Sequence, residues 1–334
     1  MAQTMDDKIH SVDCRWLLAL YAIIPISVLT VMVDMIWLDS KLLDQYLPSN
    51  PNRWAFWTVI FGLPHIIAST LTMADREYLG HYRRRLTIPL LIFAAITAAG
   101  VLGPRPDSYN MLFIFVAFYT IYHVLAQQLG LTLMMMGVAP TRDFQVWKWS
   151  AIFAGFAVYV SVYGRQFSYI NIGSLPLFDI ITYVAGGLIA LMVVLAIRMT
   201  PRARFSIGKW YLWGNVLMLV SVFLTKEAGY TVFVVMIPRI IHDLTAFSVY
   251  ITHDRNRNKE APKNLIYKLT HLVPLPAYIL LPLVSVAIAY PLTSNSSHEI
   301  ILIAVLTVTL LHYYFEGFIW RGTTPHKKHV AFRR

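Results

Sequence analysis

Residues 175–197, LPLFDIITYVAGGLIALMVVLAI, decide the fold class of this chain. The stretch holds one charged residue, Asp179, and that residue stands near its beginning. A helix rises by about 1.5 Å per residue, so roughly 20 apolar residues cross the hydrocarbon core of a bilayer, which is about 30 Å thick. The stretch therefore predicts a transmembrane helix.

Comparable apolar stretches lie on both sides of it and fill most of the chain. The 334 residues are 57% hydrophobic and 13% charged, whereas about 25% charge is usual for a soluble domain. We predict an all-α, polytopic helical bundle of about ten transmembrane helices, forming a single transmembrane domain over residues 1–334. The predicted helices are 16–37, 54–73, 86–103, 109–137, 147–163, 175–197, 210–225, 230–251, 272–290 and 299–320.

The basic residues alternate between the loops of this arrangement. One side holds 22 Lys and Arg residues, the other side holds 5, and Arg239 lies inside a helix. By the positive-inside rule, the first side is cytoplasmic. We therefore expect a cytoplasmic N-terminus (1–15), a cytoplasmic loop (252–271) and a basic cytoplasmic tail (321–334), in a protein of the bacterial cell inner membrane.

The net charge of +11 raises nucleic acid as a partner. The basic residues sit in short loops between apolar segments, which argues against nucleic acid and makes the lipid bilayer the first partner. Cys14 is the single cysteine, so one chain can form no disulfide and no cysteine-based zinc or iron–sulfur site.

Four of the 11 histidines fall well inside predicted helices: His65, His123, His242 and His312. Counted from the outer ends of their helices, they are the twelfth, fifteenth, thirteenth and fourteenth residues. This spread corresponds to about 4.5 Å of depth. Because all four helices run from the outside to the cytoplasm, we expect the imidazoles to meet at one level and to bind a metal ion.

Two carboxylates lie nearest to this level, Asp243 beside His242 and Glu316 one turn after His312. Imidazole and carboxylate together suit iron, copper, manganese or zinc, and we expect iron first, with copper or zinc as further options. Glu316 or Asp243 would be an additional ligand or a general base. Arg239, one turn outward, would neutralise a carboxylate or hold an anionic group of the substrate.

Plainer interpretations compete with this one. A single buried histidine in a membrane helix is most often an interhelical hydrogen-bonding contact, and Glu316 would pair with Arg321 if it stood at the inner interface. A further polar group near the cytoplasmic edge consists of solvated loop residues, or forms an entrance for a polar head group or a second metal site. Its members are Asp75, Arg76, Glu77, His81, His253, Asp254 and His271.

The closing helix, His312-Tyr313-Tyr314-Phe315-Glu316-Gly317-Phe318-Ile319-Trp320-Arg321, resembles the end of a group of uncharacterised bacterial multi-pass membrane proteins. Residues 61–65, FGLPH, and 75–78, DREY, look similar to theirs as well. The likeness covers about a tenth of the chain and implies no particular activity. In general plan the chain is similar to membrane non-haem iron oxygenases, although the HxxxH and HxxHH boxes of membrane desaturases are missing.

Four functions remain open at this point. The first is a membrane-embedded, metal-dependent oxidoreductase that uses O2 on a hydrophobic small-molecule substrate and receives electrons from a redox partner. The second is a haem-binding electron-transfer protein with two of the histidines as axial ligands. The third is a secondary transporter or channel with a His/Asp/Glu relay, and the fourth is a partner-binding subunit without chemistry of its own.

Overall fold

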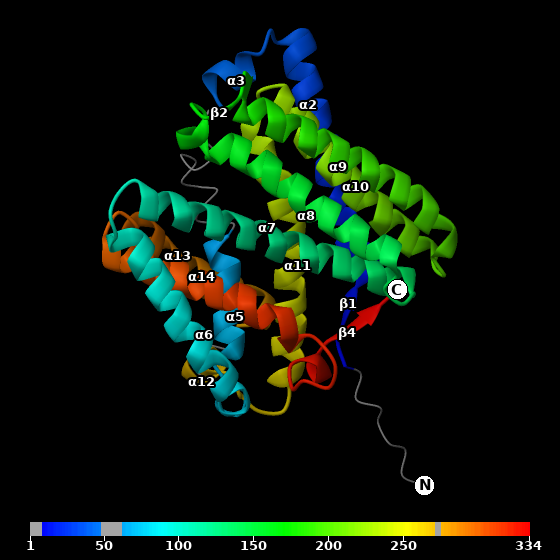
Figure 1. Cartoon of the computed structure of the whole chain (residues 1–334). Helices are drawn as coiled ribbons and strands as arrows, with labels where there is room; N and C mark the ends of the chain where they lie inside the picture. Colours follow the sequence, from blue (N-terminus) through cyan, green and yellow to red (C-terminus); the bar gives the residue numbers. More distant parts are fainter. Residues whose placement is uncertain (1–8, 48–61, 271–274) are drawn as a thin grey trace. The chain divides into compact units, whose positions relative to one another are not determined.

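The computed structural model describes residues 9–47, 62–270 and 275–334, and it is all-α (Figure 1). Within these residues, nine helices are long and apolar enough to cross a membrane. The first consists of three consecutive pieces, α1 (Cys14–Ala19), η1 (Leu20–Ala22) and α2 (Ile23–Trp37). The others are α6 (Arg76–Leu102), α7 (Asp107–Met136), α8 (Arg142–Tyr163), α9 (Leu177–Met199), α10 (Ser206–Glu227), α11 (Thr231–Arg257), α13 (Ala277–Ser294) and α14 (Glu299–Ile319).

These helices confirm the predicted helical bundle and indicate an integral membrane protein. The predicted helix at 54–73 corresponds to α5 (Leu63–Met73) in its second half, and its first half lies outside the described residues. Smaller elements lie between the long helices, before the first of them and after the last. They are α3 (Lys41–Gln45), α12 (Leu265–Leu269), η3 (Arg165–Phe167), η4 (Thr200–Arg202), η5 (Lys327–His329), β1 (Ser11–Asp13), β2 (Asn171–Ile172), β3 (Leu175–Pro176) and β4 (Ala331–Arg333).

Two predicted boundaries differ from the structure for a physical reason. α6 begins at Arg76, ten residues before the predicted 86, because its first turns are helical but too charged for a hydropathy criterion. Asp75 caps this helix by accepting a hydrogen bond from the Glu77 backbone N–H, which satisfies a donor that has no partner within the helix. Likewise α11 continues to Arg257, past the predicted end at 251.

The chain forms two compact units. The first contains Met1–Cys14, Val59–Pro104 and Asp243–Arg334, and the second contains Arg15–Thr58 and Arg105–His242. α11 is shared, because the division falls between His242 and Asp243 inside this one helix.

In the second unit, α10 packs against α7, α8, α9 and α2. The approach of α10 to α7 depends on Gly208, because a Cβ there would lie 2.4 Å from the Cα of Met136. A buried polar network joins the same helices: the Asn215 side-chain amide donates to the hydroxyls of Tyr21 and Thr132. The Tyr21 hydroxyl in turn donates to Gln128, so Gln128 is an interhelical contact in this structure.

In the first unit, α14 packs against α5 and α6, and α13 packs against α5. β1 and β4 pair in parallel, with Ser11 opposite Ala331 and Asp13 opposite Arg333.

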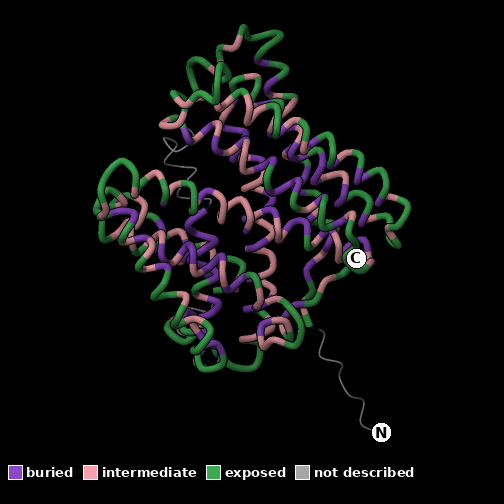
Figure 2. Tube along the Cα trace, viewed as in Figure 1, coloured by how far each residue is buried: buried purple, intermediate pink, exposed green. Residues whose placement is uncertain are grey.

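Figure 2 shows exposed residues along the sides of the long helices as well as at their ends. Large apolar side chains such as Leu29, Met111 and Ile300 are among the exposed ones, as expected for surfaces that face lipid.

Candidate metal centre

His65 and His312 lie side by side in the first unit. α5 begins at Leu63, directly after Gly62 with a φ of 90°, and places His65 in its first turn. Pro64 also stands in this turn, where a missing N–H costs no helical hydrogen bond. The ring centroids of His65 and His312 are 5.0 Å apart with their planes at 75°, and both side chains are buried.

Asp243 holds the His65 ring from one side. The Nδ1 atom of His65 lies 3.2 Å from Oδ1 of Asp243. The other carboxylate oxygen accepts a hydrogen bond of 2.7 Å from the Gly62 backbone N–H, so the carboxylate ties the start of α5 to α11. Carboxylates orient metal-binding imidazoles in this way. Asp243 therefore contacts His65 and not its neighbour in the sequence, His242. Successive residues of a helix point about 100° apart around its axis.

His123 and His242 form a second pair of rings, in the second unit. His123 comes from the middle of α7 and His242 from the middle of α11. Their ring centroids are 5.0 Å apart with the planes at 81°, and both side chains are buried. Pro238 stands one turn before His242, where it removes one hydrogen bond from the helix.

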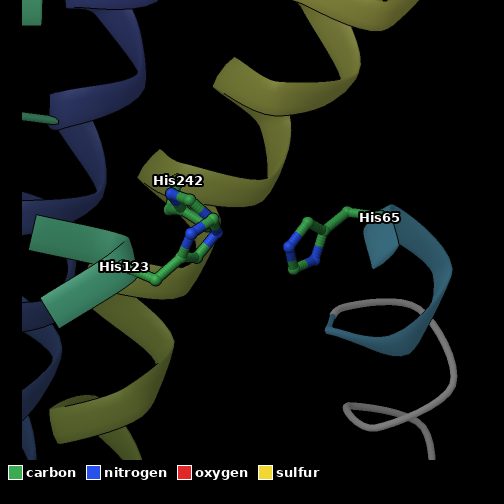
Figure 3. A group of neighbouring side chains, drawn as sticks. All are labelled: His65, His123 and His242. Atoms are coloured by element: carbon green, nitrogen blue, oxygen red, sulfur yellow. The ribbon is translucent and has the colours of Figure 1, made fainter. Parts of the chain in front are cut away.

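Three of the four predicted histidines form a group that could hold a metal ion. His65, His123 and His242 each offer one ring nitrogen, and these nitrogens lie within 4.8 Å of one another (Figure 3). Metal–nitrogen bonds are about 2.0–2.1 Å long, so two nitrogens on one ion lie up to about 4.2 Å apart. Three nitrogens spaced evenly around one ion lie about 3.6 Å apart, so the three rings would have to close in by up to about 1 Å to share a metal ion. Three imidazoles suit several transition metals and leave coordination positions for other ligands.

Glu316, the second predicted carboxylate, lies buried within a set of donors. Its Oε1 atom accepts hydrogen bonds from the hydroxyls of Ser69 and Tyr250, each at 3.0 Å. Its Oε2 atom accepts one of 2.7 Å from the indole N–H of Trp320. Glu316 and Trp320 follow His312 at intervals of four residues, so the three share one face of the chain. The carboxylate thus fixes the stretch of α14 that carries His312.

Arg239 lies on α11, half-buried, one turn before Asp243. Its proposed role towards a carboxylate or an anionic substrate stays a prediction.

The polar group expected near the inner edge divides into buried and exposed members. His253, Asp254 and Asp75 are buried, so the interpretation as solvated loop residues is wrong for them, whereas Arg76 and His81 are exposed. The His253 ring contacts Asp254 through Nδ1 at 2.9 Å. His271 lies outside the described residues.

Two residues of this buried cluster were not expected from the sequence. The Tyr78 hydroxyl lies 2.8 Å from Nε2 of His253, and the ring of His326 stacks on Tyr78 with centroids 3.9 Å apart. Burial lowers the pKa of His326 to about 2. His326 comes from the basic tail and Tyr78 from a charged turn of α6, so hydropathy gave no signal for their meeting.

Comparison of the chain with known protein families, curated proteins and solved structures finds no match. The helices and the histidine group define the class of the protein: it is a helical membrane protein with a buried histidine triad that could bind a metal ion.

Proposed function

We propose that this protein is a membrane-embedded, metal-dependent oxidoreductase that uses O2 on a hydrophobic substrate. One observation carries the proposal: His65, His123 and His242 offer buried ring nitrogens within 4.8 Å of one another. Histidines on membrane helices are costly unless they bind, pair or react. The convergence of three histidine rings on one place supports the interpretation that they bind a common ligand.

The surrounding residues have defined roles in this proposal. His65, His123 and His242 hold the metal ion, and His312 stands beside His65 as a fourth ligand or as a packing partner for its ring. Asp243 holds His65 in the orientation that leaves Nε2 for the metal. Glu316 positions α14, since its two oxygens already accept hydrogen bonds from three donors.

Iron is the metal that we expect first, with copper or zinc as further options, because imidazoles bind all three. Bound iron would supply the redox chemistry with O2. The protein would supply a site from which water is excluded, and a hydrophobic substrate would reach it from the lipid. A redox partner would deliver electrons, and Arg239 would hold an anionic group of the substrate.

We place the protein in a bacterial inner membrane, and the distribution of charge supports its orientation there. The side with 22 basic residues carries both chain ends and the loop before α13, so we place this side in the cytoplasm. Fusion of a reporter enzyme to either end would test this orientation.

The direct test of the metal site is elemental analysis of the purified protein in detergent. We expect about one metal ion per chain, and loss of most of it in His65→Ala and in His123→Ala. His298→Ala is the matched control, because His298 is an exposed histidine at the start of α14. Less than about 0.2 equivalents in the unmodified protein, or full retention in both variants, would remove the proposal.

Haem is the alternative cofactor and receives less support. A porphyrin plane must lie between two axial imidazoles, whereas each observed pair of rings packs edge to face at 5.0 Å. A visible spectrum separates the two ideas, because a haem protein shows an intense Soret band. A transporter or channel would instead show substrate flux in proteoliposomes that Glu316→Gln abolishes.

A further inference from the structure

A polar pocket of about 370 Å³ opens beside the end of α11, in the first unit. Three segments that are distant in the sequence form its wall: Ile9, the chain between Asn256 and Lys263, and the pair Lys328 and His329. Its size lies within the range usual for small-molecule sites. None of the histidines of the proposed metal site lines this pocket, so a ligand bound in it would be distinct from the metal ion.

The wall of this pocket is strongly basic. It contains Lys259, Lys263 and Lys328 beside the carboxylate of Glu260, together with Arg257, whose guanidinium also pairs with Asp75 and Glu77. Burial lowers the pKa of His329, so this ring is neutral at pH 7 and contributes an N–H donor instead of a charge. The pocket therefore attracts an anion.

Arg257 is held in a fixed orientation at this wall. Its Nε atom donates to Asp75 at 3.0 Å, and its Nη2 atom donates to Glu77 at 2.7 Å. The guanidinium also lies over the ring of Tyr78, 4.8 Å from its centroid. These bonds use Nε and Nη2, so the two hydrogens on Nη1 remain for a ligand. A guanidinium fixed in this way binds a phosphate group with little loss of entropy.

Two asparagine side chains hold the rest of the wall in place. Asn256 donates from Nδ2 to the backbone oxygens of His10 and His329, both at 2.8 Å, and accepts from the His10 N–H. Asn258 accepts from the backbone N–H groups of Lys263 and Asn264. The first asparagine joins three segments, and the second folds the loop that carries the lysines. A binding site prepared in this way loses less affinity to ordering.

We propose that this pocket binds a phosphate-bearing ligand, with Arg257 as the fixed contact and Lys259, Lys263 and Lys328 as the surrounding positive charges. Membrane topology requires basic residues in loops. It does not require them to converge on one hollow from separate segments, or to stand on segments that side-chain hydrogen bonds hold together. The ligand is the head group of an anionic phospholipid or a soluble phosphate compound, since both present the same chemistry.

The experiment uses the whole protein and has two arms. In the first, nanodiscs of phosphatidylcholine alone are titrated with inorganic pyrophosphate, and binding is followed by isothermal calorimetry. In the second, native mass spectrometry in detergent measures the retention of phosphatidylglycerol against phosphatidylcholine. Binding of pyrophosphate identifies a soluble ligand, and preferential retention of phosphatidylglycerol identifies a lipid.

The test variant is Lys263→Glu/Lys328→Glu, which reverses two charges of the pocket. The matched control is Arg83→Glu/Arg84→Glu, which makes the same change in net charge at exposed positions of α6. We expect the test variant to lose at least about tenfold in affinity and the control to change by less than about twofold. If charge reversal prevents folding, Lys263→Gln/Lys328→Gln replaces it.

Two results would overturn the proposal. One is that the unmodified protein binds no pyrophosphate and also retains phosphatidylglycerol no better than phosphatidylcholine. The other is that the pocket variants and the control lose affinity equally, because this would make the effect one of overall charge. Neither result depends on the metal content of the protein, so the outcome is distinct from that of the metal analysis.

Discussion

The Nδ1 atom of His65 lies 3.2 Å from the Oδ1 atom of Asp243, and both residues are buried. A carboxylate at this place orients the ring and favours the tautomer that carries its proton on Nδ1, as carboxylates do beside metal-binding imidazoles. The same carboxylate accepts from the Gly62 backbone N–H, so it also fixes the turn from which His65 starts.

The first prediction concerns this pair. Asp243→Asn should lower metal affinity by about 10- to 100-fold, because an amide orients the imidazole less strongly and carries no charge. Competition with a chelator of known affinity measures the change. Asp179→Asn, at an exposed position near the start of α9, is the control. Equal affinity in the two variants would contradict the role assigned to Asp243.

The second prediction concerns the donors around Glu316. Tyr250→Phe removes one hydrogen bond to the carboxylate and should cost about 1 kcal/mol of unfolding free energy. Glu316→Ala leaves two buried hydroxyl donors and the part-buried indole N–H of Trp320 without this acceptor and should cost roughly 2–4 kcal/mol. Unfolding in a mixed detergent series measures both variants. If Tyr250→Phe cost as much as Glu316→Ala, the carboxylate would not be the centre of this network.

The third prediction concerns the pH dependence of stability. The pKa of His326 is about 2 in the folded protein because burial disfavours the charged ring, whereas the unfolded value is about 6.5. The unfolded chain therefore binds more protons below pH 6.5, and stability falls as the pH falls. At pH 5 this single residue should cost about 2 kcal/mol.

His326→Phe tests this expectation, because phenylalanine keeps the stack on Tyr78 and cannot be protonated. The loss of thermal stability between pH 7 and pH 5 should be smaller in this variant than in the unmodified protein. His298→Phe, at an exposed position, should leave the loss unchanged. An identical pH profile in all three proteins would assign the acid sensitivity to other groups.

The fourth prediction concerns the packing of α10 against α7. Gly208→Ala would place a Cβ 2.4 Å from the Cα of Met136 and 2.7 Å from the Met135 carbonyl oxygen. Backbone atoms cannot give way as flexible side chains do, so we expect a cost of at least about 2 kcal/mol. Gly187→Ala on α9 has no atom within 4 Å of its Cβ and should be neutral or slightly stabilising. Thermal unfolding of the two variants compares them directly.

The long helices could be predicted from the sequence because the thickness of a bilayer sets the length of an apolar stretch. Residues 175–197 predict α9 to within a few residues for this reason. The burial of the four histidines could also be expected, since polar groups on membrane helices avoid lipid. The charged first turns of α6 were missed because hydropathy does not recognise a helix outside the bilayer.

The contact partners of individual site residues could not be predicted, because they depend on how the helices pack in three dimensions. The sequence placed Asp243 beside His242, and only the direction of its side chain on α11 assigns it to His65. The meeting of Tyr78, His253 and His326 joins residues up to 248 positions apart. The pocket at Arg257 likewise combines segments from both ends of the chain, which no local pattern indicates.

α11 carries His242 and Asp243 as neighbours, and each side chain already has its own contact. His242 packs against His123, and Asp243 holds His65 and Gly62. Rotation of the helix about its axis would break both contacts at once, as would a shift of one residue along that axis. A movement that keeps both contacts therefore takes α11 together with its neighbours or bends it before His242, and Pro238, which removes a helical hydrogen bond there, is the expected place of a bend.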